Sequence, residues 1–244
     1  MCVLSFAATA ACAGEDCKYS ADRSAALDVA GAERIEIIAR AGTLNVRPGV
    51  ATTVKARGKA CTSSEEYLAM TQLHARREGA VARIFVQVPD EMQGMGVHYA
   101  TLDLTVEVPA ALPVEITDTS GDMNVENAQV VHITDSSGDI RVRGPTADLE
   151  INDSSGELRV EDAKGAVDLT DSSGSIYVAG AKDVNIRQDS SGDIHIERIA
   201  GSVRIDNDSS GDIEIAGVGR DVEVVADSSG TVNVNDVKGT VRVP

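Results

Sequence analysis

The sequence predicts an all-β protein, a single β-solenoid of 17–19-residue coils with an irregular N-terminal cap. Two observations support this prediction. The motif Asp-(Ser/Thr)-Ser-Gly occurs seven times between residues 118 and 230, and its glycines lie 17 to 19 residues apart. Aliphatic residues recur at fixed positions between these glycines. A constant period this short is typical of stacked coils, each of which buries its apolar residues against its neighbours.

A first strand is expected directly after each glycine. One aliphatic residue stands two positions after the glycine and another stands four positions after it, as Ile140 and Val142 do after Gly138. This alternation places both side chains on the buried face of a strand. The pairs are Met123 and Val125, Ile140 and Val142, Leu158 and Val160, Ile176 and Val178, Ile194 and Ile196, Ile213 and Ile215, and Val232 and Val234.

A second strand is expected later in each repeat, with apolar pairs such as Val167 and Leu169. The linker between the two strands carries another apolar residue, which we expect to form a third inward column. The members of this column are Ala128, Ala163, Ala181, Ile199, Val218 and Val237. The recurring Ser-Gly and Lys-Gly steps would interrupt any helix. Residues 102–244 are therefore predicted to form roughly eight regular coils, stacked about 4.8 Å apart.

Residues 14–101 are predicted to contain the N-terminal cap and degenerate coils. Ile35 and Ile37, followed by residues 42–46 (Gly-Thr-Leu-Asn-Val), repeat the order of strand, glycine and strand without the Asp-Ser-Ser part. We expect this segment to form an early coil, with the remaining irregular structure covering the open end of the stack.

Two local elements are expected within the cap. Ser63 with Glu66 resembles a capping box, which predicts a short helix. Residues 72–77 and 81–88 flank Glu78 and Gly79 in the manner of a β-hairpin.

Residues 1–13 are predicted to be a signal peptide. Residues 3–11 are apolar or small, and Ala11-Cys12-Ala13 before Gly14 has the small-x-small form of a signal-peptidase site. Cleavage there predicts an exported protein, located in the periplasm, at the cell surface or outside the cell. Lipid anchoring at Cys12 and the absence of processing are the alternatives. The stretch is too short to span a membrane, so no transmembrane segment is expected in the mature chain.

Cys17 and Cys61 are the cysteines that remain after this cleavage. An even number of cysteines in an exported chain favours a disulfide between them. Two free buried thiols are the alternative.

The chain is strongly acidic, with 22 basic and 39 acidic residues and a net charge of −17. Such a surface repels phosphate backbones, and a chain with no Trp and two Phe offers few rings on which bases stack. Nucleic acid is therefore not expected as a partner, whereas a protein or another component of the cell envelope is. The outward strand positions carry mixed Arg, Glu, His and Asn residues, which is typical of a solvated surface.

No catalytic residue and no cofactor-binding residue is predicted. The short linkers of the repeats leave no long loops to form the walls of a cleft. Asp recurs in every coil, whereas catalysis by carboxyl groups needs one pair in unequal environments. The histidines lack metal-ligand spacing and are expected at the surface or in the cap, and the tyrosines are expected to have packing roles. These residues are His74, His98, His132 and His195, and Tyr19, Tyr67, Tyr99 and Tyr177.

The aspartates of the repeated motif are Asp118, Asp135, Asp153, Asp171, Asp189, Asp208 and Asp227. Stacking brings them to one edge of the rod, about 4.8 Å apart, where their like charges repel. We expect each carboxylate to accept hydrogen bonds from the backbone of its own Ser-Ser-Gly turn, with the serines forming a hydroxyl ladder. The alternative is that neighbouring carboxylates share Ca²⁺. This acidic edge and the cap are the surfaces expected to meet a partner.

The repeat Asp-Ser-Ser-Gly-Asp-Ile-x-(Val/Ile), preceded by residues 102–109 and 112–116, resembles a bacterial β-strand-repeat family of "putative adhesins", a domain family of unknown function. The likeness covers the chain from Ile35 onward. It implies an exported β-solenoid with an adhesive role, and it offers no catalytic residues to carry over. We therefore expect a non-catalytic adhesin or an envelope binding or scaffold module. The alternatives are a polysaccharide-acting enzyme on a β-helix and a structural envelope protein without a dedicated ligand.

Overall fold

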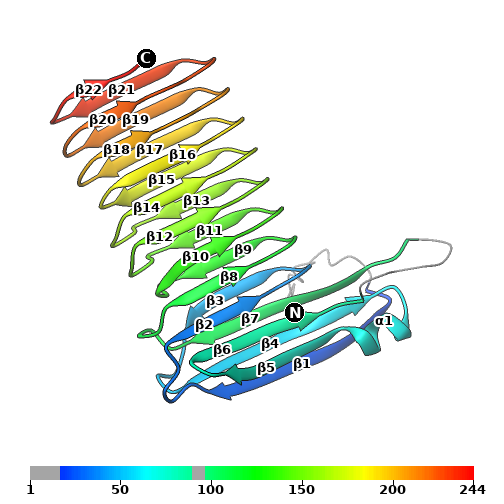
Figure 1. Ribbon diagram of the computed structural model, residues 1–244. Helices are drawn as coiled ribbons and strands as arrows, with labels where there is room; N and C mark the ends of the chain where they lie inside the picture. The colour runs from blue at the N-terminus through cyan, green and yellow to red at the C-terminus, as the bar shows by residue number, and fades with distance from the viewer. Residues whose placement is uncertain (1–16, 90–96) are drawn as a thin grey trace, which may run out of the picture.

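The computed structural model describes residues 17–89 and 97–244. The predicted signal peptide, residues 1–13, lies outside the described residues. Two sheets of 11 strands each form the long faces of an elongated rod (Figure 1). Within the described part of the chain, no helix has the length and apolar character needed to cross a membrane.

We name the two faces sheet A and sheet B. Sheet A contains, in spatial order, β1 (Tyr19–Asp28), β4 (Thr53–Thr62), β7 (Ala100–Val108), β3 (Leu44–Pro48), β9 (Met123–Glu126), β11 (Ile140–Arg143), β13 (Leu158–Glu161), β15 (Ile176–Ala181), β17 (Ile194–Ile199), β19 (Ile213–Val218) and β21 (Val232–Val237). Sheet B contains β5 (Gln72–Glu78), β6 (Val81–Gln87), β2 (Arg34–Ile38), β8 (Val114–Thr117), β10 (Val130–Thr134), β12 (Leu149–Asn152), β14 (Val167–Thr170), β16 (Val184–Gln188), β18 (Val203–Ile205), β20 (Val222–Val224) and β22 (Val241–Arg242).

Each regular coil contributes one strand to each sheet, and matching residues of successive coils pair in parallel. In sheet A, Ile140 pairs with Leu158, which in turn pairs with Ile176. In sheet B, Val167 pairs with Val184. All five side chains are at most 2% exposed. The predicted strand pattern is therefore confirmed, and aliphatic side chains stacked on one another fill the narrow space between the sheets.

The third inward column is also confirmed. The linker residues Ala128, Ala163, Ala181, Ile199 and Val218 are buried, and Val237 is partly buried against the same core. The coils therefore bury apolar residues on both strands and in most linkers, except in the last coil, where Val232 and Val234 are partly exposed and Val241 and Val243 are 46% exposed.

The solenoid has about seven turns of about 19 residues, fewer than the sequence predicted. The regular coils were predicted to begin with residues 102–108. These residues lie in β7, which pairs in parallel with β3 and antiparallel with β4. They therefore belong to the capped end of the rod and do not start an additional regular coil.

Chain order and stacking order differ at this end. The predicted early coil is confirmed as β2 and β3, but it lies between β6 and β7 on one side and β8 and β9 on the other (Figure 1). Ile35 pairs with Val114, and Leu44 pairs with Met123, so the early coil continues the register of the regular coils. After β3 the chain leaves the stack, forms β4, α1 and β5, and returns through β6 and β7 on the outer side.

The helix α1 (Glu65–Met70) starts one residue later than predicted. Its N-cap is Ser64, whose Oγ accepts a hydrogen bond from the Tyr67 N–H at 3.2 Å. The predicted capping box of Ser63 and Glu66 is therefore wrong, because Tyr67 occupies the third helical position and cannot complete a box. The Ser63 hydroxyl instead accepts a hydrogen bond from the Tyr99 N–H at 3.2 Å. The predicted hairpin is confirmed as β5 and β6, which pair antiparallel.

Two contacts hold the cap together. Cys17 and Cys61 form the predicted disulfide, with 5.5 Å between their Cα atoms, and it joins the start of β1 to β4. The Arg23 guanidinium donates hydrogen bonds to the carbonyl oxygens of Leu68 (2.8 Å) and Thr71 (2.9 Å). These carbonyls lie at the C-terminal end of α1, where no backbone N–H groups of the helix remain to pair with them.

Candidate functional site

The Asp-(Ser/Thr)-Ser-Gly turns stack at the corner where the chain passes from sheet B to sheet A. Their aspartates point into the rod. Six of them are between 0% and 4% exposed: Asp118, Asp135, Asp153, Asp171, Asp189 and Asp208. Asp227, in the last turn, is partly exposed. The prediction of an acidic edge that meets a partner is therefore wrong for these six residues, because their carboxyl groups are covered by the turns.

The predicted turn hydrogen bonds are confirmed for most of the column. Asp171 Oδ1 accepts hydrogen bonds from the N–H groups of Ser172 (2.7 Å) and Ser173 (3.3 Å). Asp118, Asp135, Asp153, Asp189 and Asp227 accept from their own turns in the same way. Asp208 differs, since neither of its carboxyl oxygens has a hydrogen-bond partner among the described residues.

The serines form a ladder, but the acceptors are backbone carbonyls and not other hydroxyls. Ser173 Oγ donates to the carbonyl oxygen of Ser154 in the neighbouring coil at 3.1 Å. Ser137, Ser155, Ser210 and Ser229 make the corresponding contact. The hydroxyls thus tie each turn to the turn of the previous coil.

The strict glycine of the motif has a steric cause. Gly174 has φ of +133°, which residues with a side chain rarely adopt, and a Cβ placed on it would lie 1.7 Å from the carbonyl oxygen of Gly156. The glycines of successive turns are packed directly against one another, so a side chain at this position has no room.

The buried carboxyl groups have raised pKa values. Burial raises the pKa of Asp118 and Asp189 to about 7 and that of Asp135 and Asp171 to about 6. Hydrogen bonds from the turn oppose this shift in each case, and a neighbouring carboxylate adds to it. The Oδ2 atoms of all six buried residues have no hydrogen-bond partner among the described residues. The described residues also contain no cluster of three or more His, Cys, Asp or Glu side chains suited to a metal ion.

A second group of side chains lies on the outer face of sheet A. Arg159, Tyr177 and His195 stand on neighbouring strands and pair in register. The Arg159 guanidinium carbon lies 3.9 Å from the centroid of the Tyr177 ring. The rings of Tyr177 and His195 are stacked, with centroids 5.2 Å apart and planes 2° apart. His195 Nδ1 lies 3.2 Å from Glu214 Oε2 on the next strand.

Carboxylates on the same face hold this group in place. Tyr177 Oη donates a hydrogen bond to Glu197 Oε1 at 2.8 Å, which raises the pKa of Tyr177 and lowers that of Glu197. Glu161 accepts from Arg159 (2.8 Å) and Arg143 (3.0 Å), and these hydrogen bonds lower its pKa. These contacts join side chains of neighbouring strands into one group on the outer face of sheet A.

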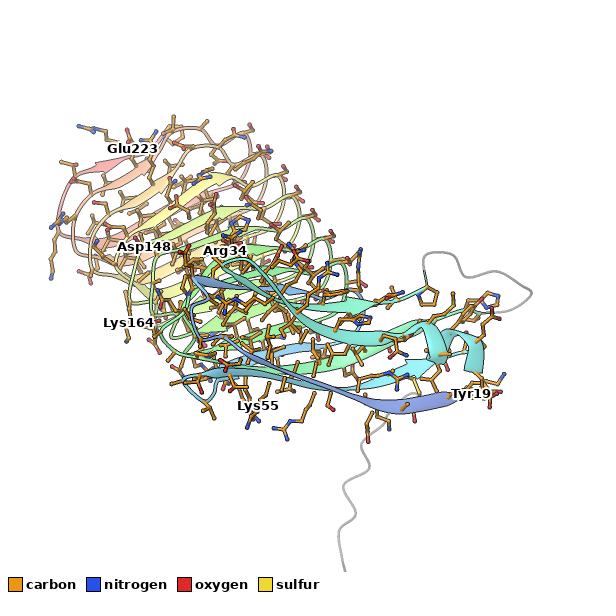
Figure 2. All side chains as sticks on the ribbon, turned by 60° about the horizontal axis from the view of Figure 1, so that its bottom comes forward. Tyr19, Arg34, Lys55, Asp148, Lys164 and Glu223 are labelled. Atoms are coloured by element: carbon orange, nitrogen blue, oxygen red, sulfur yellow. A yellow bond between two sulfur atoms is a disulfide. The ribbon has the colours of Figure 1, made fainter. Side chains whose placement is uncertain are left out.

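A shallow depression of about 270 Å³ lies beside the stacked group, lined in part by Asn124, Arg141, Arg143 and Arg159. We call Arg141, Arg143, Arg159, Glu161, Tyr177 and His195 together the outer-face cluster. Figure 2 shows side chains projecting from the rod along its length, among them the labelled Lys55 of β4, in the same sheet as the cluster, and Glu223 of β20, on sheet B. Each of the three Arg side chains of the outer-face cluster is paired with a carboxylate, Arg141 with Asp139 and both Arg143 and Arg159 with Glu161.

Tyr177 was expected to have a packing role, and His195 was expected at the surface or in the cap. The structure stacks the two rings on the outer face of sheet A. The signal was present, because Arg159, Tyr177 and His195 each stand three positions after a motif glycine. His132 lies on sheet B, 3.5 Å from Glu150, and His74 stacks on Phe85 in the cap hairpin, away from the cluster.

A family model described as Toastrack DUF4097 matches residues 32–186, more than half of the chain. The chain belongs to the Toastrack family. The resemblance predicted from the repeats is thereby confirmed, and the family is a domain of unknown function with a β-solenoid fold. The part of this Toastrack chain that matches includes Arg159 and Tyr177, whereas His195 lies beyond it. A search of curated proteins found no match.

Several solved structures resemble this Toastrack chain in fold. A "putative adhesin" from Bacteroides fragilis has a TM-score of 0.55 at 14% identity, with 92% of this chain and 96% of that chain covered. A "putative lipid binding protein" from Parabacteroides distasonis has a TM-score of 0.45 at 15% identity, with 91% and 97% covered. A "putative cell adhesion protein" from Clostridium sporogenes has a TM-score of 0.43 at 9% identity, with 92% and 100% covered. At these identities the likeness concerns the fold alone.

Proposed function

We propose that this protein is a non-catalytic binding module of the bacterial cell envelope, and that it binds its partner through the outer-face cluster on sheet A. The observation that carries the proposal is the stack of Arg159, Tyr177 and His195 on three adjacent strands. Tyr and Arg supply much of the binding energy at protein interfaces. Side chains that are already fixed also lose less conformational entropy when a partner binds.

The rigidity of the support favours the same role. The strands β13, β15 and β17 pair in parallel register and bury their inward residues in the core. The cluster therefore stands on regular strands, which hold side chains more precisely than loops do. The name of the Bacteroides fragilis structure, a "putative adhesin", agrees with a binding role.

The environments of the carboxyl groups support a non-catalytic role over that of a polysaccharide-acting enzyme. A general acid needs a raised pKa and access to the substrate. The six aspartates with raised pKa values are at most 4% exposed, so they are out of reach of a substrate. Glu161, which lines the depression, has a lowered pKa because Arg159 and Arg143 pair with it. Neither group has the properties of a general acid.

An exported location is part of the proposal, in the periplasm, at the cell surface or outside the cell. The predicted signal peptide and the Cys17–Cys61 disulfide support it, because the cytosol keeps thiols reduced. The partner we infer is a protein or another component of the envelope.

Site-specific photo-crosslinking in living cells tests the proposal. A photo-reactive residue is placed at Arg141, beside the stacked group, and in a second strain at Arg187, on sheet B. The two side chains have similar exposures of 45% and 50%, and replacing either one leaves the stack of Tyr177 and His195 intact. We expect a discrete crosslinked product from position 141 and none from position 187. Equal products from both positions, or products from position 187 alone, would contradict the proposal.

A further inference from the structure

We propose that the six buried aspartates, named here the aspartate column, hold protons in the folded rod and make its stability depend on pH. In their neutral form they keep the corner packed, and in their ionised form they loosen it. This inference does not depend on the proposed binding function, because it concerns the interior of the rod.

Backbone contacts fix the column. The N–H of Asp135 donates to the carbonyl of Asn152 at 3.0 Å, and that of Asp171 donates to the carbonyl of Gln188 at 2.9 Å. Asp189 forms a bridge with Asp208 in the next coil. Each carboxyl group therefore lies beside its counterparts one coil away, in the same buried corner.

The turn of Asp171 shows how the donors next to a column carboxyl group are used. In the turn of Asp171, the N–H groups of Ser172 and Ser173 donate to Oδ1, and the Ser173 hydroxyl donates to the carbonyl oxygen of Ser154. The Oδ2 atoms of the six aspartates are buried and have no partner within the described residues. A buried, unpaired charge costs far more than a buried neutral group, so a proton on Oδ2 lowers the cost of burying it.

The charges that act on the column most strongly are negative. They come from the column itself, from Asp139 beside Asp153, and from Asp227 beside Asp208. Asp171 and Asp208 both act on Asp189. The strands that enclose the column contribute aliphatic inward side chains, such as Leu169 and Ile176. The surroundings thus favour the neutral form, in agreement with the raised pKa values of Asp118, Asp135, Asp171 and Asp189, about 6 to 7.

The direction of the pH effect follows from these values. An ordinary Asp loses its proton near pH 3.8, whereas burial raises the pKa of Asp135 and Asp171 to about 6 and that of Asp118 and Asp189 to about 7, and raises the pKa of Asp153 and Asp208 as well. Between these limits the folded chain binds more protons than the unfolded chain, so stability falls as the pH rises. The stabilisation of the fold by the protonated carboxyl groups is complete below about pH 4. It is lost as the pH rises through about 6 to 7.

Melting as a function of pH tests the proposal, with Asp189→Asn as the main variant. The amide keeps an oxygen for the turn N–H groups and cannot ionise, so it imitates the protonated carboxyl. Asp193→Asn, at an exposed position four residues further on, is the control that removes a charge of the same sign. We expect the wild-type midpoint to fall by several degrees from pH 5 to pH 8. Asp189→Asn should melt above wild type at pH 8 and close to it at pH 5, while Asp193→Asn should follow the wild-type profile.

Infrared difference spectra of the wild-type protein between pH 5 and pH 8 provide a readout that needs no variant. We expect the carbonyl band of protonated, buried carboxyl groups at pH 5 and at pH 6, and its loss by pH 8. A wild-type midpoint that does not fall with pH, the absence of this band at pH 6, or an Asp189→Asn variant less stable than wild type at pH 8 would each overturn the proposal.

Discussion

The rings of Tyr177 and His195 lie parallel on adjacent strands of sheet A, with 5.2 Å between their centroids and 2° between their planes. Arg159 covers the Tyr177 ring from the preceding strand. Parallel pairing in register places the three side chains at equivalent positions of successive coils. A solenoid of this kind converts three residues that lie 18 positions apart in the sequence into one continuous surface.

The contact between these two rings should be measurable as a coupling energy. We expect the double-mutant cycle of Tyr177→Ala and His195→Ala to give about 0.5 to 1 kcal/mol, the size typical of stacked rings and of cross-strand pairs. Chemical denaturation of the four proteins provides the free energies of unfolding. A coupling energy of zero would mean that the two rings stabilise the rod independently and that the cluster is not a fixed unit.

Substitution at the glycine column should be strongly destabilising. In Gly174→Ala, the new Cβ would lie 1.7 Å from the Gly156 carbonyl oxygen, so the two coils must separate. We expect a loss of more than about 3 kcal/mol in the free energy of unfolding, measured by chemical denaturation. Gly79→Ala is the control for a left-handed backbone without a contact, because Gly79 has φ of +62° and no atom within 4 Å of the new Cβ. A loss in Gly174→Ala no larger than that in Gly79→Ala would contradict a clash between the glycines of neighbouring coils.

An inward charge should disrupt the stack beyond its own coil. Ile176→Asp places a carboxylate without a partner between two aliphatic side chains, Leu158 and Ile194, which pair with it on either side. Because each coil depends on its neighbours, we expect loss of protection from hydrogen exchange in the adjacent coils as well. Arg187→Ser, which removes an outward side chain on sheet B, should leave the exchange pattern unchanged. Disruption confined to one coil would argue against cooperative stacking.

Calcium should have little effect on stability. The Oδ1 atoms of the column are engaged by backbone N–H groups, with Asp208 as the exception, and the described residues contain no cluster of three or more ligands suited to a metal. We expect the melting midpoint to be nearly the same in millimolar Ca²⁺ and in chelator. A large rise with Ca²⁺ would restore the interpretation in which neighbouring carboxylates share the ion.

The sequence predicted the coils well because their causes are local and repeated. Ile140, Leu158 and Ile176 occupy the same place in each repeat, and only an inward position explains this pattern. The stacking order of β7 and β3 was not predictable in the same way. It depends on where the chain rejoins the sheet after β4, α1, β5 and β6. The repeated motif is absent from this segment, so the sequence pattern does not indicate which strand β7 pairs with.

The candidate site was less predictable, for two physical reasons. The direction of the Asp171 side chain depends on the turn conformation, which buries the carboxyl group where charge alone suggested an exposed edge. The cluster around Tyr177 depends on contacts between residues of different types at equivalent positions of successive coils. Such contacts are not evident when the sequence is searched for columns of identical residues. A second mixed column lies at the corner between sheet A and sheet B, where the backbone is left-handed at Asn127, Asp162, Arg198 and Asp236, with φ of 48°, 55°, 58° and 51°, and Gly occupies the alternate coils.

The most direct test of the binding proposal is a binding curve of the labelled protein on isolated bacterial envelopes. The account predicts saturable binding that is lost in the double variant Arg159→Ser/Tyr177→Ser. Binding should be retained in Glu150→Ser/Arg187→Ser, which removes a matched ion pair of 2.8 Å from the outer face of sheet B. Undiminished binding by the sheet A variant, with melting midpoints confirming that both variants are folded, would contradict the account.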